Sequence, residues 1–346
     1  MSSILLTTAM TICFVAGKSG GHLLPCITHA KKIYQQNPQA QLYVFTSGSE
    51  LDKTILQKNN FLTELAPTTL DNPPYDHLWM LPWFAIKTAW YFTKSLYLMY
   101  QLKPDKIISY GGFISLPVIL AAKTLRIPVE IYELNVQPGK ATMFLSKIHG
   151  PIFTCFQKTR SYLPKNNCIP FDYPVRFNES DLQYNRSELL KKYNFEPNRK
   201  TVLILGGSQG SILLNQVIKD CINQHSEFTN QIQIIHQTGQ SDPFDYAAFY
   251  AQHRIPHVVF GYHEKLQNFY NLADVIVSRA GAGTLFEIKF FNKPCICVPH
   301  QTAHTNHQIE NVLELAQEFP NQFYIIEQSK FDATILLNAL RKIIAI

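Results

Sequence analysis

The chain has 346 residues, of which 46% are hydrophobic and only 16% are charged, and this composition excludes a disordered protein. At roughly 150 residues per domain, the length predicts two domains, each large enough for a core of its own. The net charge of +6 favours an anionic partner weakly, and it is too small to predict nucleic-acid binding.

Short apolar runs alternate with helical patterns along the first half of the chain. Continuous apolar runs separated by helices are typical of a parallel sheet that is covered on both faces. The runs predicted as strands are Thr11–Ala16, Gln41–Phe45, Lys106–Ser109, Val129–Tyr132 and Ile152–Phe156.

The second half repeats this order, beginning with a strand-like run and a glycine-rich loop. The sequence therefore predicts two doubly wound α/β domains, residues 1–168 and 175–330, joined through the proline-containing stretch Pro164–Phe177. It leaves open which domain the final helix, residues 331–346, packs against. The strands predicted here are Thr201–Leu205, Gln231–His236, His257–Val259, Asp274–Ser278 and Cys295–Val298.

Glycine-rich loops follow three of the predicted strands, at Gly17–His22, Gly111–Gly112 and Gly206–Gly210. Glycines let the backbone approach a ligand, and the next helix directs free N–H groups at an anion. One such loop is weak evidence, because a tight strand–helix turn has the same composition and no loop is a Walker motif or a clean GxGxxG. Three loops predict that both domains bind phosphate-like groups, with a cleft between the domains.

His22 lies at the start of the helix that follows the first loop. The helix dipole disfavours an imidazolium ion there, so a neutral ring can accept a proton as a general base. A histidine that only caps the helix fits the same position, and the local pattern by itself favours that simpler role.

The stretch Ser278–Glu287 follows another predicted strand, and its small residues again permit backbone contact with a ligand. Glu287 is expected in the first turn of the next helix, where the dipole favours a carboxylate. Its side chain can accept two hydrogen bonds from a ribose diol, or it can satisfy the backbone of its own helix. The pattern leaves both roles open.

No metal and no cofactor are expected. His300, His304 and His307 lie close together in the sequence, but no carboxylate or Cys stands at ligand spacing, which favours a polar loop that contacts a sugar. The seven cysteines have no CxxC spacing, which excludes a zinc module and a disulfide framework and is typical of a reducing cytoplasm.

The chain carries, in order, the motifs GKSGGH, YGGFISLP, YELNVQPG, YPVR, LGGSQGS, HQTG, VSRAGAGTLFE and HQIEN. This series resembles the MurG-type glycosyltransferases, which add N-acetylglucosamine (GlcNAc) to lipid I in peptidoglycan synthesis. The resemblance extends from Thr11 to about Asn311. It implies the GT-B fold, with the lipid acceptor on the N-terminal domain and the UDP-GlcNAc donor on the C-terminal domain.

The resemblance also implies roles for individual residues. His22 is the candidate catalytic base, Glu287 contacts the ribose hydroxyls, Ser208 lies at the diphosphate, and the backbone near His263 lies against uracil. The full set of substrate contacts implied is Ser19, Gly20, Gly21, Asn135, Arg176, Ser208, His263, Ala282, Gly283, Thr284, Leu285, Phe286, Glu287 and Gln308.

The chain departs from the family pattern in three places, and the loss of a His and a Gln at the second of them bears on fine donor or acceptor specificity. Gly17, Lys18 and Ser19 stand where the family usually has two glycines and a threonine, and Lys18 adds a positive side chain near the diphosphate. The usual His-Glu-Gln-Asn is Tyr132–Asn135 here, which retains only the Glu and the Asn. Thr305 and Asn306 replace a common acidic pair.

The activity implied is inverting transfer of GlcNAc from UDP-GlcNAc to the C4 hydroxyl of undecaprenyl-linked lipid I, giving lipid II, without a metal. A UDP-GlcNAc 2-epimerase of the same fold is the main alternative, and a noncatalytic protein that binds a nucleotide sugar is a third. An NAD dehydrogenase is disfavoured, because neither domain has a clean GxGxxG followed by an acidic residue about 20 positions on.

All three Trp residues, Trp79, Trp83 and Trp90, lie within Leu78–Tyr100. Pro82, Lys87 and Lys94 argue against a membrane-spanning helix. On a helix, the two lysines form one narrow polar stripe beside a wide apolar surface, which fits an interfacial helix on an anionic membrane. A buried helix of the first domain is the alternative. With a lipid-linked acceptor, the expectation is a peripheral enzyme on the cytoplasmic face of the inner membrane.

Overall fold

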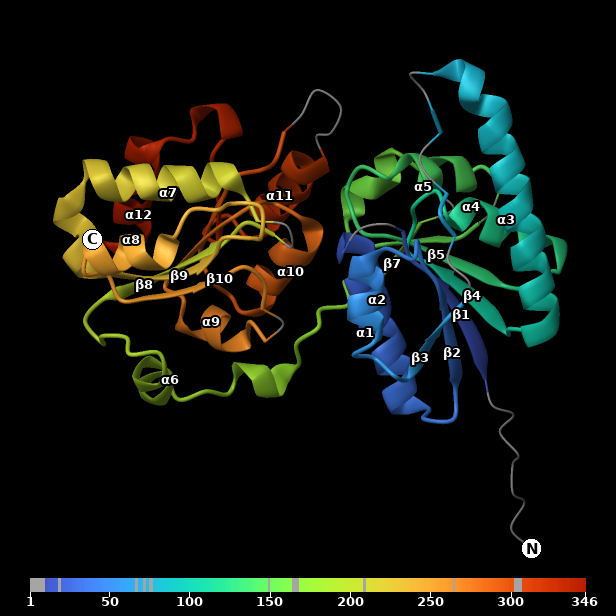
Figure 1. Cartoon of the computed structure of the whole chain (residues 1–346), viewed down its shortest axis with the longest axis horizontal. Coiled ribbons are helices and arrows are strands. Elements are labelled where there is room, and N and C mark those ends of the chain that lie inside the picture. The colour runs from blue at the N-terminus through green and yellow to red at the C-terminus, as the bar shows by residue number, and fades with distance from the viewer. Residues whose placement is uncertain are drawn as a thin grey trace, which may run out of the picture. The chain divides into compact units, whose positions relative to one another are not determined.

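The computed structural model describes residues 10–17, 20–65, 68–70, 73–74, 77–148, 150–163, 168–207, 210–263, 265–301 and 307–346. The chain folds as two compact units, of which the first ends at Arg176 and the second begins at Phe177 (Figure 1). None of the helices within these described ranges is long and apolar enough to cross a membrane.

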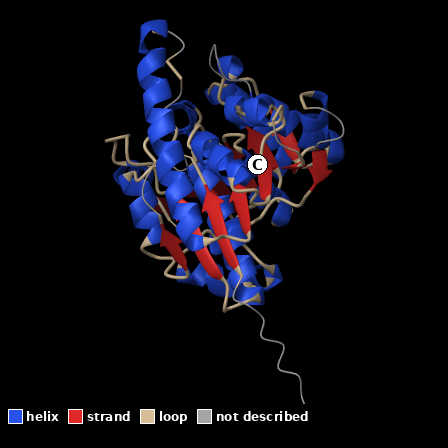
Figure 2. Cartoon of the chain, turned by 90° about the vertical axis from the view of Figure 1, so that its right-hand side faces the viewer, coloured by secondary structure: helices blue, strands red, loops and turns tan. Residues whose placement is uncertain are grey.

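The first unit is built on a seven-stranded sheet in which all the neighbouring strands are parallel (Figures 1 and 2). The strand order is β3-β2-β1-β4-β5-β6-β7. The strands are β1 (Thr11–Val15), β2 (Gln41–Phe45), β3 (Leu62–Glu64), β4 (Lys106–Ser109), β5 (Val129–Glu133), β6 (Ile152–Thr154) and β7 (Cys168–Pro170). The helices are α1 (Gly20–Gln36), α2 (Glu50–Leu56), η1 (Leu78–Met80), α3 (Leu81–Leu102), α4 (Ser115–Thr124), α5 (Lys140–Leu145) and η2 (Gln157–Ser161).

Strand β1 shows why the buried strands of this sheet are continuous apolar runs in the sequence. Ile12 and Phe14 face a core formed with α1 and α2, whereas Cys13 and Val15 face a second core formed with α3, α4 and α5. Successive side chains of a strand point to opposite faces, so a sheet that is covered on both faces needs apolar residues at every position. Figure 2 shows the long helix α3 running along the outside of this sheet.

The second unit has a six-stranded parallel sheet in the order β10-β9-β8-β11-β12-β13. Helices α7 and α9 lie on opposite sides of it (Figure 1). The strands are β8 (Lys200–Leu205), β9 (Ile232–Gln237), β10 (His257–Phe260), β11 (Val275–Ser278), β12 (Cys295–Cys297) and β13 (Phe323–Ile325). The helices are η4 (Glu179–Leu182), α6 (Arg186–Lys192), α7 (Ile212–Gln224), η5 (Ser226–Gln231), α8 (Tyr246–Gln252), α9 (Gln267–Leu272), α10 (Ala282–Phe290), α11 (His307–Glu318), η6 (Gln328–Lys330) and α12 (Ala333–Ile344).

The final helix, α12, packs within the second unit. Asp332 caps its first turn by accepting a hydrogen bond from the Ile335 N–H at 2.8 Å. Its buried face, which includes Leu336 and Leu340, joins the same core as Ile218 of α7. The sequence left the partner of this helix open, and the core contacts assign it to the second sheet.

Each sheet has one point at which the strand order reverses. In the first unit this point lies between β1 and β4, and in the second it lies between β8 and β11. Helices leave in opposite directions at such a point, so a crevice opens beyond the carboxyl ends of the strands, and ligands of doubly wound folds bind there. The glycine-rich loops singled out in the sequence follow β1, β4 and β8.

Candidate functional site

The loops after β1 and β4 touch at the reversal point of the first sheet. Gly112 has a φ of +82°, and a Cβ on it would lie 2.8 Å from the Cα of Gly17. Two independent reasons therefore require glycine at position 112: the positive φ, and the close approach of the Gly17 backbone. The two glycines bring the backbones of two loops, nearly 100 positions apart in sequence, into direct contact.

His22 lies beside these paired loops. It is the third residue of α1, it is partly buried, and its Nδ1 atom would lie 3.3 Å from a Cβ on Gly17. Gly20 and Gly21 precede it as the first residues of the helix, where N–H groups are left without intrahelical partners. The structure thus brings His22, Gly20 and Gly21 to the reversal point, whereas Lys18 and Ser19 lie outside the described residues.

A buried carboxylate organises the loop that carries Asn135. Glu133, at the end of β5, accepts hydrogen bonds from the backbone N–H groups of Leu134 at 3.0 Å, Asn135 at 3.1 Å and Gly139 at 3.1 Å. Burial raises the pKa of Glu133, and these hydrogen bonds oppose that shift. The carbonyl of Asn135 also accepts a hydrogen bond from the Thr159 hydroxyl at 3.1 Å, so the loop is fixed on two sides.

Tyr132, one of the departures from the family pattern, is a packing residue. Its ring stacks on Tyr110 at 5.2 Å and on Phe153 at 4.7 Å, and it meets Phe171 edge-on at 4.8 Å. Such aromatic contacts stabilise a core beyond the area they bury. Tyr132, which stands where the family usually has His, therefore packs in the core beneath the Asn135 loop.

In the second unit, the loop after β8 packs on the loop after β9. A Cβ on Gly210 would lie 2.4 Å from the carbonyl oxygen of Thr238 and 2.6 Å from the Cα of Gly239. The helix α7 starts directly afterwards, and the hydroxyl of Ser211 caps it by accepting from Leu214 N–H at 3.4 Å. This places the free N–H groups of α7 at the reversal point. Ser208 lies outside the described residues.

A buried polar network holds the loop after β9. Asn215 of α7 donates hydrogen bonds to the Thr238 carbonyl at 3.0 Å and to Asp242 at 2.9 Å. His236 contacts Asn215 through Nε2 at 3.0 Å and Tyr250 through Nδ1 at 2.8 Å. Burial lowers the pKa of His236 to about 3, so the ring is neutral at physiological pH and acts as structural support.

Arg279 lies on the other side of this reversal point, in the residue after β11. Its Nε donates to the Ser211 hydroxyl at 3.0 Å, and its Nη1 donates to the carbonyl of Val298 at 3.2 Å and to Gln328 at 2.8 Å. Its Nη2 makes no hydrogen bond to any described residue. Burial lowers the pKa of the guanidinium.

Gln308 joins two loops in the same region. Its Oε1 accepts hydrogen bonds from the backbone N–H groups of Ala280 at 3.2 Å and His300 at 2.8 Å. Two donors at one end fix the orientation of the amide, because only the oxygen can accept them. The Nε2 group makes no hydrogen bond to the described residues, so it has donor capacity that these contacts do not use.

Glu287 is in the second turn of α10, not in the first turn as expected from the sequence. Gly281 is the N-cap, and the helix starts at Ala282, so the small residues predicted as loop already form the first turn. The Glu287 carboxylate accepts a hydrogen bond from the Tyr270 hydroxyl at 2.8 Å. The partly exposed carboxylate is therefore held by a buried tyrosine of α9.

The other residues expected from Ala282 to Phe286 form the start of α10. Leu285 is fully buried and Phe286 nearly so, so their side chains belong mainly to the core and only their backbones and the smaller residues remain for ligand contact. His263 is exposed after β10, where its Nδ1 accepts from the Lys265 N–H at 3.1 Å. Arg176 is the last residue of the first unit.

Among the described residues, no three His, Cys, Asp or Glu side chains are grouped to hold a metal ion. His304 lies outside the described residues. Of its two neighbours, His300 is exposed, and burial together with His300 lowers the pKa of His307.

Two models of one enzyme family match this chain. The N-terminal domain of glycosyltransferase family 28 matches residues 12–154, and the C-terminal domain of the same family matches residues 201–345. The chain belongs to glycosyltransferase family 28. Each family 28 domain covers one of the two units, and each contains one of the two reversal points.

Several relatives that share one name align with most of this chain. A protein of Geobacter sulfurreducens is 27% identical over 96% of this chain and 89% of its own, and one of Thermodesulfovibrio yellowstonii is 29% identical over 88% and 82%. Both are named UDP-N-acetylglucosamine–N-acetylmuramyl-(pentapeptide) pyrophosphoryl-undecaprenol N-acetylglucosamine transferase. These alignments confirm the MurG-type resemblance that the sequence motifs indicated.

The fold is similar to that of MurG from Acinetobacter baumannii, with a TM-score of 0.72 at 24% identity over 97% of this chain and 91% of that one. A glycosyltransferase of kitacinnamycin has a TM-score of 0.69 at 14% identity, with 97% and 91% covered. These likenesses, together with the two parallel sheets, confirm the predicted GT-B fold.

The sequence pattern did not indicate Arg279 as a candidate site residue. Its signal was visible, because a charged residue directly follows a buried strand within a run of small residues. It also missed the supports of the site: Tyr270 behind Glu287 and the Asn215–His236 pair behind the loop after β9. Asn215 lies outside the quoted motifs, whereas His236 begins HQTG, and no local pattern connects the two residues.

Proposed function

We propose that the chain transfers GlcNAc from UDP-GlcNAc to the C4 hydroxyl of the N-acetylmuramic acid in an undecaprenyl-diphosphate acceptor, with inversion at the anomeric carbon. The proposal rests mainly on one observation. In this family 28 chain, each sheet has a glycine-rich loop at the point where its strand order reverses, one beside His22 and the other at the start of α7. Relatives over most of the chain bear the name of this activity.

Product analysis tests the proposal directly. Labelled UDP-GlcNAc is incubated with the lipid-linked acceptor, and the expected product is a β-1,4-linked disaccharide on the lipid. The 2-epimerase alternative predicts free N-acetylmannosamine without any acceptor, and membership of a glycosyltransferase family favours the transferase. Label that remains only in UDP-GlcNAc would contradict both enzymes.

The donor is assigned to the second unit. The N–H groups at the start of α7 and the glycine backbone near Gly207 and Gly210 suit a diphosphate, since a helix N-terminus favours anions. Glu287 suits the ribose diol, because a carboxylate is an acceptor for two hydroxyl donors. Gln308 Nε2 suits a sugar hydroxyl, and the backbone near His263 suits the uracil ring.

Replacing Glu287 by Ala is expected to weaken UDP binding by about 1.5–3 kcal/mol, the contribution of hydrogen bonds to a charged group. The Tyr270→Phe variant removes only the hydroxyl that holds the carboxylate at 2.8 Å, and a smaller loss is expected. Isothermal titration calorimetry with UDP measures both. Glu318→Ala, an exposed carboxylate of α11, serves as the control. Unchanged UDP affinity in Glu287→Ala would exclude the ribose contact.

In the proposed reaction, His22 accepts the proton of the attacking hydroxyl while UDP leaves with developing negative charge. Arg279 is suited to stabilise that charge, because its guanidinium is held by Ser211 at the start of α7 and its Nη2 makes no hydrogen bond to a described residue. Its partners are neutral, and no carboxylate among the described residues is paired with it. A fixed positive charge and a helix N-terminus then act on the same diphosphate.

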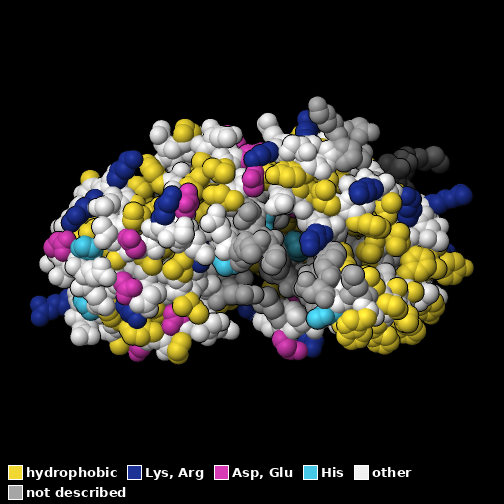
Figure 3. Space-filling view, turned by 90° about the horizontal axis from the view of Figure 1, so that it is seen from above, with side chains coloured by type: hydrophobic (Ala, Val, Ile, Leu, Met, Phe, Trp, Pro, Cys, Tyr) yellow, Lys and Arg dark blue, Asp and Glu magenta, His cyan; other side chains and the backbone are white. Residues whose placement is uncertain are grey.

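A second part of the proposal is that η1 and α3 dock the enzyme on an anionic membrane. The side chains of Trp79, Trp83 and Trp90 are 78%, 56% and 67% exposed. Figure 3 shows hydrophobic side chains gathered over η1 and α3 on one side of the first unit. We call the exposed side of these helices the aromatic face; it consists of Trp79, Leu81, Trp83, Ile86, Trp90, Tyr97 and Tyr100.

The chemistry of the aromatic face fits a lipid headgroup region. Exposed Trp and Tyr rings suit the membrane interface, and α3 contains Lys87 and Lys94 but no Asp or Glu. Lys87 lies 5.8 Å from the centre of the Trp83 ring. The opposite side of α3, including Met99, packs on the core of the first unit, so the helix lies along the protein and presents one face outwards.

Serine at Trp79, Trp83 and Trp90 is expected to reduce co-sedimentation with anionic vesicles by tenfold or more, because each exposed indole provides roughly 1.5–3 kcal/mol when buried in an apolar environment. UDP binding should not change. A matched triple variant, with serine at the exposed Leu182, Tyr184 and Leu313 of the second unit, should sediment as wild type does. If the wild type does not bind such vesicles, or the Trp variant binds equally well, the docking proposal is wrong.

A further inference from the structure

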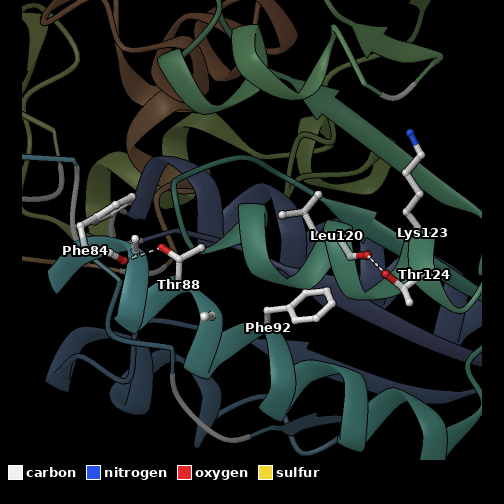
Figure 4. A pocket seen from close by; sticks show the side chains of 8 residues that line it. Phe84, Thr88, Phe92, Leu120, Lys123 and Thr124 are labelled. Atoms are coloured by element: carbon white, nitrogen blue, oxygen red, sulfur yellow. Dashed lines mark hydrogen bonds between the residues drawn. The ribbon is translucent and has the colours of Figure 1, made fainter. Parts of the chain in front are cut away.

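An apolar groove of about 670 Å³ runs between α3 and α4, next to the aromatic face (Figure 4). This volume is within the range of small-molecule sites, roughly 300–1,000 Å³. Ala85 and Ala89, one helical turn apart on α3, leave the hollow open, and Phe84 and Phe92 flank it. On the side of α4, Leu120 lines the groove.

The polar groups around the groove are already bonded. The Thr88 hydroxyl donates to the Phe84 carbonyl at 2.8 Å, and the Thr124 hydroxyl donates to the Leu120 carbonyl at 2.9 Å, as Figure 4 shows. Both threonines use their single O–H donor within their own helices, so neither hydroxyl is free to donate to a polar ligand. A groove with such walls favours hydrocarbon over any polar molecule.

Lys123 sets the charge at the rim. Its side chain extends away from the groove in Figure 4, and its ammonium group donates a hydrogen bond to the carbonyl of Ile148. Neither α3 nor α4 contains an acidic residue. An apolar floor with a lysine at its edge is complementary to a hydrocarbon chain that carries an anionic head.

Helix α4 connects the groove with the loop beside His22. The Ser115 N–H donates to Gly112 at 3.0 Å, and its hydroxyl donates to Gly111 at 2.9 Å, so the first residue of α4 is anchored on that loop. Leu120 and Thr124 lie further along the same helix. At 1.5 Å per residue, Leu120 and Thr124 lie roughly 8 and 14 Å along the helix from Ser115.

We propose that this groove binds the hydrocarbon chain of the lipid-linked acceptor, in the segment next to its diphosphate. The inference rests on the proposed function, because it is the acceptor that has both a sugar for the His22 loop and a chain for the groove. A phospholipid acyl chain would also fit the apolar walls, but a phospholipid carries no sugar that could bind at the loop beside His22, at the other end of α4. Chain binding in the groove therefore positions the acceptor, whereas the aromatic face docks the whole enzyme.

The test uses acceptors with the same sugar, peptide and diphosphate, but with either a long isoprenoid chain or an ethyl group, assayed without vesicles. Wild type should show a KM for the long-chain acceptor at least about tenfold lower, because each buried methylene adds to the binding free energy. Ala89→Phe fills the groove and should abolish this difference while kcat/KM for the ethyl acceptor stays unchanged. Thr93→Phe, which adds the same ring at an exposed position one turn further along α3, should behave as wild type does.

The outcomes separate the groove from the activity. A long-chain preference that survives in both Ala89→Phe and Ala85→Phe would overturn the groove proposal while the proposed function stands. Absence of any transfer by wild type to either acceptor would instead contradict the proposed function. Both alanines are exposed, so these variants leave the core intact.

A binding measurement provides a readout besides activity. All three Trp residues lie in η1 and α3, so tryptophan fluorescence, excited selectively over tyrosine, reports on this segment alone. Addition of a polyprenyl diphosphate without a sugar, below its micelle concentration, should shift the emission of wild type and Thr93→Phe but not of Ala89→Phe. A phospholipid monomer that competes equally well would identify the site as one for general lipid and would overturn the assignment to the acceptor.

Discussion

Replacing His22 by Ala is expected to lower kcat by roughly 10²–10⁴-fold, the usual contribution of a positioned general base, and to leave UDP binding nearly unchanged. The ring lies beside the paired backbones of Gly17 and Gly112, where the first sheet reverses its strand order. It is the titratable side chain placed at the start of α1, and a neutral imidazole there can take the proton from an attacking hydroxyl. Turnover at saturating donor and calorimetry with UDP measure the two effects.

Glu287→Ala is the natural counterpart for this experiment. It should weaken UDP and UDP-GlcNAc binding but retain most of kcat at saturating donor, the reverse of the pattern expected for His22→Ala. A fully active His22→Ala variant would exclude the base. Loss of UDP affinity in that variant would instead make His22 a donor contact.

The alternation of apolar runs and glycine loops predicted both sheets, because buried parallel strands need apolar residues on both faces and strand–helix turns need glycine. Three edge strands were not predicted. β3 and β13 lie at the edges of their sheets, and only the first of their three residues is buried. β7, Cys168–Pro170, lies in a stretch that its prolines marked as a linker.

The error at Glu287 has a specific cause. Small residues such as Ala282 and Gly283 are typical of a loop, yet Gly281, with φ −67° and ψ 139°, is an extended N-cap, and the helix begins directly after it. Glycine and alanine in a first turn give no apolar periodicity, so the sequence pattern places the start of α10 too late. Glu287 consequently lies one turn deeper, where Tyr270 can reach it.

For α3, the sequence predicted a wide apolar surface but not which part of it would be buried. Phe84 and Phe92 pack against the core of the first unit, whereas their neighbours Trp83 and Trp90 are exposed. All of these residues are aromatic, and only the position of α4 beside α3 decides between them. The groove follows from the same packing, so no sequence pattern could indicate it.

Arg279 is a candidate site residue whose partners only the fold brings together. Its replacement by Ala is expected to lower kcat by about 10²–10³-fold, as for loss of one donor to a developing anion. Its partners Ser211 and Gln328 are 68 and 49 positions away in sequence. Because Nη2 has no bond to a described residue, the guanidinium can donate to the diphosphate without giving up its supports.

The same variant separates an electrostatic role from a structural one through binding. If Arg279 acts on the diphosphate, Arg279→Ala should weaken UDP far more than uridine, and Arg279→Lys should recover part of the difference because it keeps a charge but not the planar fork. Gln328→Ala removes a neutral partner at 2.8 Å and serves as the matched control. Equal losses for UDP and uridine, or a Gln328→Ala variant as impaired as Arg279→Ala, would mean that Arg279 only holds the loops after β8 and β12 together.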